Sequence, residues 1–474
     1  MNTEPTKSPV QPAASQSYDT IIIGAGMSGL AAGIRLAHFG QRVCILERHS
    51  AIGGLNSFYR QRGRNFDVGL HAVTNFTPKG TRAGPLARLL RQLRIAWDDL
   101  ALVPQLGSAI AFPDVSLRFS NDFELLASEV RSRFPGEEVR LRQLVDKLVT
   151  YEELGGRGVD VSARTVLRET FRDPLLAEML LCPLLFYGGP REHDMDFGHF
   201  SVLFRSIYLE GLARPATGVR VILRKLVKRF RSLGGELRVR AGVRRLQVAG
   251  GRVEAVELED GTELRAKKVL SSAGLPETMR LCGSKYLQDA ASPGDVSFVE
   301  TISILSKQPK DVGHEQTIVF FNDARQFEYR SPEELADLRS GVVCSPNNFV
   351  YEEPPAEGVI RTTALANFDR WADLEPDRYR EEKLRWYERL VASAVRFVPD
   401  FRDAVIETDM FTPTTIYRFT GREKGAVYGV SGKRFDGRTP LSNLYLCGTD
   451  QGMVGIIGTL VSGIAMANRH LLKR

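Results

Sequence analysis

The strongest constraint on the fold lies near the start of the chain. A short apolar run rich in β-branched residues, 18–23, leads directly into the turn Gly24-Ala25-Gly26-Met27-Ser28-Gly29. A stretch with helical apolar spacing follows over 30–39, and a second apolar run, 42–46, ends at Glu47. A strand, a G-x-G-x-x-G turn, a helix, a second strand and a terminal acid in one short unit predict a Rossmann-type dinucleotide-binding domain, with Glu47 as the acceptor for ribose hydroxyls.

The residues of this turn have separate physical tasks. Gly24 permits the tight turn, Gly26 lets a pyrophosphate approach the backbone, and Gly29 allows the helix to pack closely on the strand. The phosphates bind free N–H groups at the positive end of the helix dipole. We therefore also expect Ala25 and Ser28 to contact the cofactor.

Length and composition are those of a soluble chain with more than one domain. At roughly 150 residues per domain, 474 residues correspond to two or three domains, and 43% hydrophobic residues suffice for sizeable cores. The polar segment 1–17, rich in Pro, Ser and Gln, is expected to be a flexible tail. It has no apolar core of the kind that a signal peptide needs. The sequence has no run of about 18 uncharged apolar residues, so a membrane-spanning helix is not expected.

Cysteine usage and charge exclude several classes of function. The five cysteines are scattered without a C-x-x-C pair, so neither a disulfide framework nor a zinc site is expected, and a reducing cytoplasm is the default compartment. The histidines form no H-E-x-x-H pattern, and no metal is predicted. The net charge is +7, but the arginines are spread along the chain and no nucleic-acid-binding motif accompanies them. Nucleic acid is therefore not an expected partner, and anionic lipid is the better candidate.

The residues after Glu47 carry a resemblance to a known superfamily. Arg48 is followed by the double glycine of Gly53-Gly54-Leu55-Asn56. This pattern resembles the extended fingerprint of the amine oxidase and phytoene desaturase superfamily of FAD enzymes, in which the stretch lies along the pyrophosphate of the cofactor. The resemblance implies non-covalently bound FAD rather than NAD. Leu55 stands where these enzymes often carry an arginine, so backbone contacts are implied but one side-chain contact is not.

The C-terminal region resembles the closing motif of the same superfamily. A short apolar run, 444–447, precedes Gly448 and Asp450, and Gly455-Ile456-Ile457 precedes a stretch with helical spacing over 458–472. The resemblance implies that Asp450 binds the ribityl chain of FAD and that the N–H groups at the start of the helix face the flavin pyrimidine. A helix N-terminus stabilises the negative charge that reduced flavin carries there.

A third match covers residues 214–274. A helical stretch, 219–233, is followed by short strand-like runs with turn signals between them. The runs are 236–239, 243–248, 252–258 and 263–269, and the last leads into Ala273-Gly274. The segment resembles the superfamily's helix and β-meander that return to the dinucleotide domain. The resemblance implies a backbone contact of Val243 with adenine and further cofactor contacts at Ala273 and Gly274.

Two further motifs point to one branch of the superfamily. The stretch 412–429 and the earlier Asp67-Val-Gly69-Leu70-His71 resemble bacterial phytoene desaturases, carotenoid cis–trans isomerases and retinol saturases. In this branch the earlier stretch lies against the isoalloxazine, so the resemblance places Leu70 and His71 beside the flavin. It also implies an oily, isoprenoid-like substrate and desaturation, saturation or isomerisation at carbon–carbon bonds. The electron acceptor or donor is left open.

These matches predict an α/β fold with two domains. A Rossmann-type FAD-binding domain is expected from three chain segments, 18–80, 214–280 and 400–474. A mixed α+β substrate domain is expected from 81–213 and 281–399. Its first part is largely helical in composition, whereas its second part mixes strand-like runs at 298–305 and 317–321 with a charged helical stretch near 376–397.

One stretch of the first insertion, 82–97, allows two interpretations. Its apolar residues share one helical face and arginines occupy the rest; the apolar ones are Leu86, Leu89, Leu90, Leu93 and Trp97. A basic amphipathic helix of this kind can lie on a membrane surface, which would place the protein peripherally on the cytoplasmic face. The alternative is a surface helix whose leucines pack into the core.

The chemistry divides between the cofactor and the protein. Flavin performs hydride transfer itself, so the protein supplies orientation and proton exchange. His71 is the first candidate acid or base, because imidazole exchanges protons near neutral pH, and a buried histidine that holds a loop is an equal alternative. Arg418 and Tyr428 are further catalytic candidates or pocket walls. Two rival functions remain: a flavin amine oxidase, and a flavin-bearing scaffold of a lipid pathway without turnover.

Overall fold

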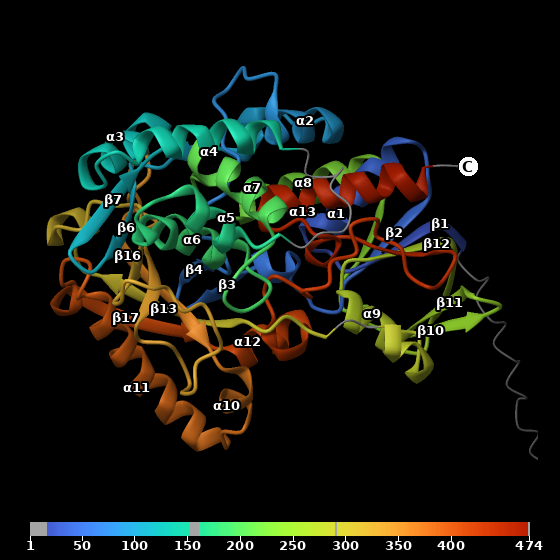
Figure 1. Cartoon of the computed structure of the whole chain (residues 1–474). Coiled ribbons are helices and arrows are strands. Elements are labelled where there is room, and N and C mark those ends of the chain that lie inside the picture. The colour runs from blue at the N-terminus through green and yellow to red at the C-terminus, as the bar shows by residue number, and fades with distance from the viewer. Residues whose placement is uncertain (1–16, 152–160, 290–291, 473–474) are drawn as a thin grey trace, which may run out of the picture.

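The computed structural model describes residues 17–151, 161–289 and 292–472. Two large sheets and the helices around them make up this part of the chain (Figure 1). Of the expected flexible tail, 1–17, only Ser17 is described, and it begins the first strand. The rest of that tail lies outside the described residues.

The first sheet contains the predicted dinucleotide-binding unit. Its strands are β1 (Ser17–Ile23), β2 (Val43–Leu46), β9 (Glu236–Arg238), β10 (Val243–Ala249), β11 (Arg252–Leu258), β12 (Glu263–Ser271) and β18 (Leu444–Leu446). They lie in the order β10-β11-β12-β1-β2-β9, and β18 pairs with β12. β18, β12, β1, β2 and β9 run parallel, whereas β10 and β11 extend the sheet as an antiparallel meander. Strands from both ends and from the middle of the chain therefore meet in one sheet.

Three helices share an apolar cluster over this sheet. They are α1 (Met27–His38), α8 (Arg220–Ser232) and α13 (Gly455–Met466). α1 contacts both of the others, and Figure 1 shows the three helices together. The cluster includes Leu30 of α1, Leu226 of α8 and Leu460 of α13. The last helix begins at Gly455 rather than at 458 as predicted, so its first turn belongs to the glycine-rich segment. The short helix α9 (Leu275–Leu281) packs on the other apolar cluster of the sheet.

The second sheet draws on parts of the chain that the sequence did not group together. In order across the sheet its strands are β17 (Val405–Phe411), β13 (Ser297–Leu305), β16 (Gly358–Ala366), β15 (Ser340–Cys344), β14 (Ile318–Asn322), β6 (Ser108–Phe112) and β7 (Val115–Phe119). β6 and β7 come from the insertion that was predicted to be largely helical. β17 falls in the segment 400–474, which was assigned to the FAD-binding domain, yet it pairs with β13. The pairing of β17 with β13 joins strands that are far apart in the chain, and such pairing leaves little local sequence signal.

Most of the remaining helices pack beside the second sheet. The helices are α3 (Phe123–Arg133), α4 (Glu138–Thr150), α5 (Ala163–Thr170), α6 (Pro174–Gly188), α7 (Phe197–Phe204), α10 (Phe368–Ala372), α11 (Pro376–Ala394) and α12 (Pro413–Thr420). Two small antiparallel pairs join β3 (Phe58–Gln61) with β4 (Arg64–Asp67), and β5 (Leu102–Pro104) with β8 (Ala213–Pro215).

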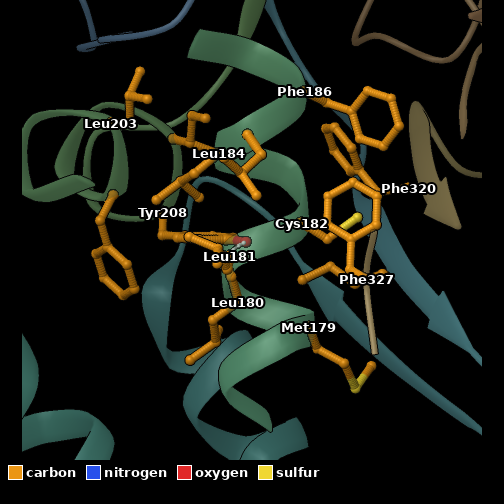
Figure 2. Packing of buried hydrophobic residues seen from close by; sticks show 14 of the residues in the cluster. Met179, Leu180, Leu181, Cys182, Leu184, Phe186, Leu203, Tyr208, Phe320 and Phe327 are labelled. Atoms are coloured by element: carbon orange, nitrogen blue, oxygen red, sulfur yellow. Dashed lines mark hydrogen bonds between the residues drawn. The ribbon is translucent and has the colours of Figure 1, made fainter. Parts of the chain in front are cut away.

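Helix α6 runs through the largest hydrophobic cluster. It is apolar on all sides, as a helix surrounded by protein should be. Figure 2 shows Met179, Leu180 and Cys182 of this helix with Phe320 of β14 and Phe327 around it. This packing holds the C-terminal end of α6, with Phe186 and Tyr187, in a defined position.

In the amphipathic stretch 82–97, the leucines pack into the core, as the second of the two interpretations predicted. Within α2 (Gly84–Leu93) the four leucines are buried against α1 and α13, and the arginines are exposed. The apolar face is therefore occupied by protein and is not available to lipid, which corrects the membrane-contacting interpretation of this helix. None of the helices in the described part of the chain combines the length and apolar character that a bilayer crossing requires.

Candidate functional site: a two-ended cavity

A cavity of about 1110 Å³ lies where the two sheets meet. At one end its lining comes from the carboxyl ends of β1, β2, β12 and β18, namely Gly24, Glu47, Ser272 and Gly448. In sheets with parallel strands, ligands bind at this edge. At the other end the lining comes from α6 and from strands of the second sheet. We call these the cofactor end and the substrate end.

The three glycines of the first turn differ in what surrounds them. Gly24 has a φ of +95°, and a Cβ atom there would lie 2.5 Å from the Ser272 Oγ. A Cβ on Gly29 would lie 2.1 Å from the Gly24 carbonyl oxygen, so α1 could not pack as closely on β1. A Cβ on Gly26 would meet nothing nearer than 3.9 Å, because this residue faces the cavity. Gly24 and Gly29 are thus required by the fold, whereas Gly26 keeps the cavity open to a ligand.

Two helix N-termini open on the cofactor end. α1 begins at Met27 and α13 at Gly455, and both residues line the cavity. Among the described residues, no side chain caps either helix and neither first turn contains an acid. The first N–H groups of a helix lack partners within it and carry partial positive charge. This cavity wall therefore fits a ligand with a diphosphate and a second negative centre.

The segment after β2 completes this wall. The Glu47 carboxylate lines the cavity and accepts hydrogen bonds from the N–H groups of Ala25 (2.9 Å) and His49 (3.0 Å). The Gly53 N–H donates to the Ala25 carbonyl at 3.0 Å, which ties the double glycine to the first turn. Gly53 and Gly54 both have positive φ, at 112° and 58°, so the backbone curves along the cavity. The next residues and several others predicted to contact the cofactor also line the cavity: Ser28, Arg48, Leu55, Asn56, Val243, Ala273 and Ile456.

Six predicted contact residues do not line the cavity: Ala25, Gly29, Leu70, Gly274, Asp450 and Ile457. Asp450 is fully buried, and its carboxylate accepts from the N–H groups of Leu275 (2.6 Å) and Val430 (3.0 Å) and from the Arg422 guanidinium (3.0 Å). Burial alone would raise the pKa of Asp450, but the positive charges of Arg422 and Lys433 lower it. Asp450 therefore holds the closing loop together. The neighbouring Thr449, which sequence analysis did not single out, lines the cavity in its place.

The substrate end has a mainly apolar lining, which we call the apolar lobe. It is lined by Phe186, Tyr187, Leu203, Phe298, Val342, Val427, Tyr428 and Val454. The Tyr428 hydroxyl donates to the Phe186 carbonyl, and burial raises the pKa of this hydroxyl. Tyr428 therefore lines the lobe and is tied to α6 by this hydrogen bond. Arg418 lies on α12, lines the cavity rim and has its guanidinium 5.5 Å from the Phe419 ring centre.

A buried charge network stands beside the apolar lobe. His71 Nε2 lies 3.0 Å from the Glu300 Oε2 and 3.0 Å from the Thr363 Oγ1. Glu300 of β13 forms an ion pair with Arg361 of β16, which also donates to the carbonyl oxygens of Leu70 and Asp67, each at 3.0 Å. Burial would raise the pKa of Glu300, but Arg361 and the His71 hydrogen bond lower it to about 2. The glutamate is therefore ionised at neutral pH.

Sequence analysis singled out His71 but missed Glu300 and Arg361. A signal for both was present in the two strands. Each is a lone charged residue inside an otherwise uncharged run, SFVETISIL for β13 and GVIRTTALA for β16. The two strands are neighbours in the sheet, and a buried charge requires a partner.

Known proteins resemble this chain in sequence and in fold over most of its length. Residues 27–471 match the family described as flavin containing amine oxidoreductase. The chain is 23% identical to prolycopene isomerase 2 of an Oncidium hybrid cultivar over 96% of its length and 84% of that protein. It is 23% identical to the all-trans-retinol 13,14-reductase of Danio rerio, covering 96% of this chain and 87% of that one. A solved variant of putrescine oxidase superimposes with a TM-score of 0.64 at 16% identity, covering 97% of this chain and all of the other.

Proposed function

Since the chain belongs to the flavin containing amine oxidoreductase family, we propose that the cavity holds FAD at its cofactor end and an isoprenoid-like substrate in the apolar lobe. The protein is an FAD-dependent oxidoreductase. The observation that carries the substrate proposal is the apolar lobe beside His71. Its lining has few polar groups with which to recognise a polar metabolite, so it favours a ligand that binds by burial of apolar surface.

We propose a placement of FAD from the backbone groups of the cofactor end. The diphosphate would bind over Gly26 at the N-terminus of α1, and the adenosine would extend past Glu47 and Val243. The flavin would lie against Thr449 and the N-terminus of α13, whose positive end favours the anionic reduced form. When bound, FAD supplies hydride transfer at its N5 atom. The protein's residues orient the ligands, exclude water and exchange protons.

The domain division is part of the same proposal. The FAD-binding domain would comprise 18–80, 214–280 and a C-terminal segment, and the substrate domain would comprise 81–213 and the second insertion. The pairing of β17 with β13 supports a C-terminal boundary after Phe411 rather than at residue 400. This division leaves the cavity at the junction of the two domains, which is a common place for a ligand site.

Among the reactions of its relatives, the apolar lobe favours chemistry at carbon–carbon bonds. Two relatives bear the names prolycopene isomerase and all-trans-retinol 13,14-reductase. We propose desaturation, saturation or isomerisation of an apolar polyene, with His71 exchanging a proton with the substrate. The opposite assignment, an amine oxidase, follows the family name and the putrescine oxidase fold. Against it, Glu300 is the carboxylate beside the lobe, and it is already paired with Arg361 and His71.

A peripheral membrane contact would supply such a substrate, and we propose it at α12 rather than at α2. Tyr417 and Phe419 of α12 are 49% and 55% exposed, although both line the rim of the cavity. Arg418 lies between them in sequence, and a cation beside exposed aromatic side chains is typical of a surface that contacts anionic lipid. Co-sedimentation with vesicles containing phosphatidylserine tests this contact. The Tyr417→Ser, Phe419→Ser double variant should lose binding, whereas Phe39→Ser, at an equally exposed position directly after α1, should retain it.

The FAD placement is tested by Gly26→Ala. This Cβ meets only open space in the apoprotein, so the melting temperature without FAD should stay unchanged. It would nevertheless occupy the position proposed for the diphosphate and weaken charge-assisted hydrogen bonds worth about 1.5–3 kcal/mol each. We expect the FAD dissociation constant to rise on the order of 100-fold, measured by flavin fluorescence titration. Unchanged FAD affinity would refute the placement.

The substrate class is tested with the purified holoenzyme. Organic extraction and mass spectrometry should identify a co-purified polyene or other long apolar lipid. In anaerobic stopped-flow experiments, prolycopene, phytoene and all-trans-retinol in detergent micelles should change the redox state of the flavin or be isomerised. Reduction of the flavin by putrescine instead would support the amine oxidase. No change with any of these compounds would favour a scaffold without turnover.

A further inference from the structure

His71 presents its two ring nitrogens to different surroundings. Nε2 lies 3.0 Å from both the Glu300 Oε2 and the Thr363 Oγ1. The Thr363 hydroxyl also lies 3.2 Å from the same Glu300 oxygen and donates to it. Among the described residues, none forms a hydrogen bond with Nδ1, while the residue itself lines the cavity. Nε2 therefore has hydrogen-bond partners within the protein, whereas Nδ1 is available to a ligand in the cavity.

Glu300 can only accept hydrogen bonds in this site. Arg361 of β16 is buried beside it, and the two form an ion pair at the base of the cavity. An ionised carboxylate has no hydrogen to donate, so the bond to His71 requires the hydrogen to reside on Nε2. In neutral imidazole the other nitrogen is then an acceptor with a free lone pair.

We propose that Glu300 is a positioning residue that fixes the Nε2–H tautomer of His71 and so makes Nδ1 the atom that exchanges a proton with the substrate. The inference rests on the proposed function, because it assumes a substrate in the apolar lobe. In this role Glu300 acts through His71, which it holds by the hydrogen bond to Nε2. A carboxylate that orients a histidine in this manner is a known way to prepare a general base.

The proton transfer balances in both directions. In a desaturation, bound FAD would supply the hydride acceptor for one carbon–hydrogen bond of the substrate. The neighbouring carbon–hydrogen bond gives its proton to Nδ1, and the electron pair of that bond forms the new carbon–carbon double bond. In a saturation, bound FAD in its reduced form would supply the hydride, and Nδ1 returns the proton to carbon. The imidazolium that forms is stabilised by Glu300, and Arg361 keeps the carboxylate from taking up the proton.

The tautomer can be measured without substrate. In the holoenzyme labelled with ¹⁵N-histidine, the nitrogen chemical shifts distinguish a protonated from an unprotonated ring nitrogen, and His71→Asn assigns the signals. We expect His71 at pH 8 to carry its hydrogen on Nε2. In Glu300→Gln the amide can donate to Nε2, so the hydrogen should move to Nδ1 in part or in full. A wild-type spectrum with the hydrogen on Nδ1 would overturn the proposal, whether or not the variant folds.

Kinetics give a second measure. With whichever of prolycopene, phytoene and all-trans-retinol reacts, Glu300→Gln should lower kcat on the order of 100-fold while KM stays within about threefold, as loss of general acid–base catalysis predicts. Thr363→Val removes the other neighbour of Nε2 but leaves the carboxylate, so it should keep the tautomer and most of kcat. Equal losses in both variants would show a merely structural role for Glu300. If none of the compounds reacts, the proposed function fails, whereas the tautomer measurement still decides the role of Glu300.

Discussion

The two ends of the cavity present different kinds of chemical groups to a ligand. At the cofactor end the ligand-facing groups are mainly backbone N–H groups, presented by a glycine turn and by the starts of α1 and α13. At the substrate end they are side chains from β13, β16 and α6, among them Glu300, which forms a buried ion pair with Arg361. A change at the first end acts through backbone sterics, whereas a change at the second acts through charge and packing.

This difference predicts how each end responds to mutation. Backbone groups cannot be replaced, so the cofactor end is sensitive where an added atom meets another backbone, as at Gly29. Burial of the ion pair at the substrate end costs free energy, and loss of one partner destabilises the fold because it leaves an unpaired buried charge.

Arg361→Met should produce the largest loss of stability. It leaves the Glu300 carboxylate buried without its guanidinium, and removal of one partner from a buried pair costs about 3–5 kcal/mol. Urea unfolding monitored by circular dichroism gives the free energy of unfolding. Arg265→Met is the control, because Arg265 and its partner Glu263 are 51% and 39% exposed, and about 0–1 kcal/mol is expected for such a surface pair. Equal losses for both variants would contradict a special role of the buried pair.

Gly29→Ala should destabilise the cofactor end by about 3 kcal/mol and weaken FAD binding with it. The new Cβ would lie 2.1 Å from the Gly24 carbonyl oxygen, and neither backbone segment can rotate away as a side chain can. Gly33→Ala in the same helix is the matched control, since its Cβ meets the movable Cδ1 of Ile45 first, at 2.7 Å. Thermal unfolding and FAD titration of both variants give the comparison. A milder effect at Gly29 than at Gly33 would count against the steric argument.

The substrate end should also respond to acid. The pKa of Glu300 is lowered from 4.5 to about 2 in the folded protein, so the unfolded chain binds a proton that the folded chain does not between these values. The stability contributed by this carboxylate is present at neutral pH and is lost as the pH falls from about 4.5 toward 2. Between pH 6 and pH 3 the loss should reach about 2 kcal/mol. Urea unfolding of the wild type and of Glu300→Gln over this range should show the difference between them shrinking. A constant difference would be inconsistent with the lowered pKa.

Tyr428→Phe should have the smallest effect, because it removes one hydrogen bond and leaves the ring in place. The lost bond to the Phe186 carbonyl corresponds to about 1 kcal/mol of unfolding free energy. If Tyr428 is a wall of the lobe, flavin chemistry with the reacting polyene should change by less than about threefold. A loss of 100-fold or more would instead assign the hydroxyl to catalysis.

The local backbone architecture could be predicted from short-range patterns in the sequence. The strand, turn, helix and strand of residues 18–47 and the meander after residue 236 lie close to where they were expected, because short-range spacing of apolar residues and glycines determines these conformations. The double glycine at 53–54 and the glycine-rich segment at the start of α13 can likewise be recognised from neighbouring residues alone. They also supply most of the residues that line the cofactor end.

Several other features depend on contacts between segments that are far apart in the chain and became visible in the folded structure. It placed Glu300 and Arg361 beside His71, put Thr449 rather than Asp450 on the cavity wall, and brought β6, β7 and β17 into one sheet. It also decided that the leucines of α2 face protein. Each of these outcomes depends on which distant segments meet, and burial and pairing between segments far apart in the chain leave little trace in any one of them. Backbone conformation is governed by near neighbours in the sequence, whereas charge pairing and exposure are governed by neighbours in space.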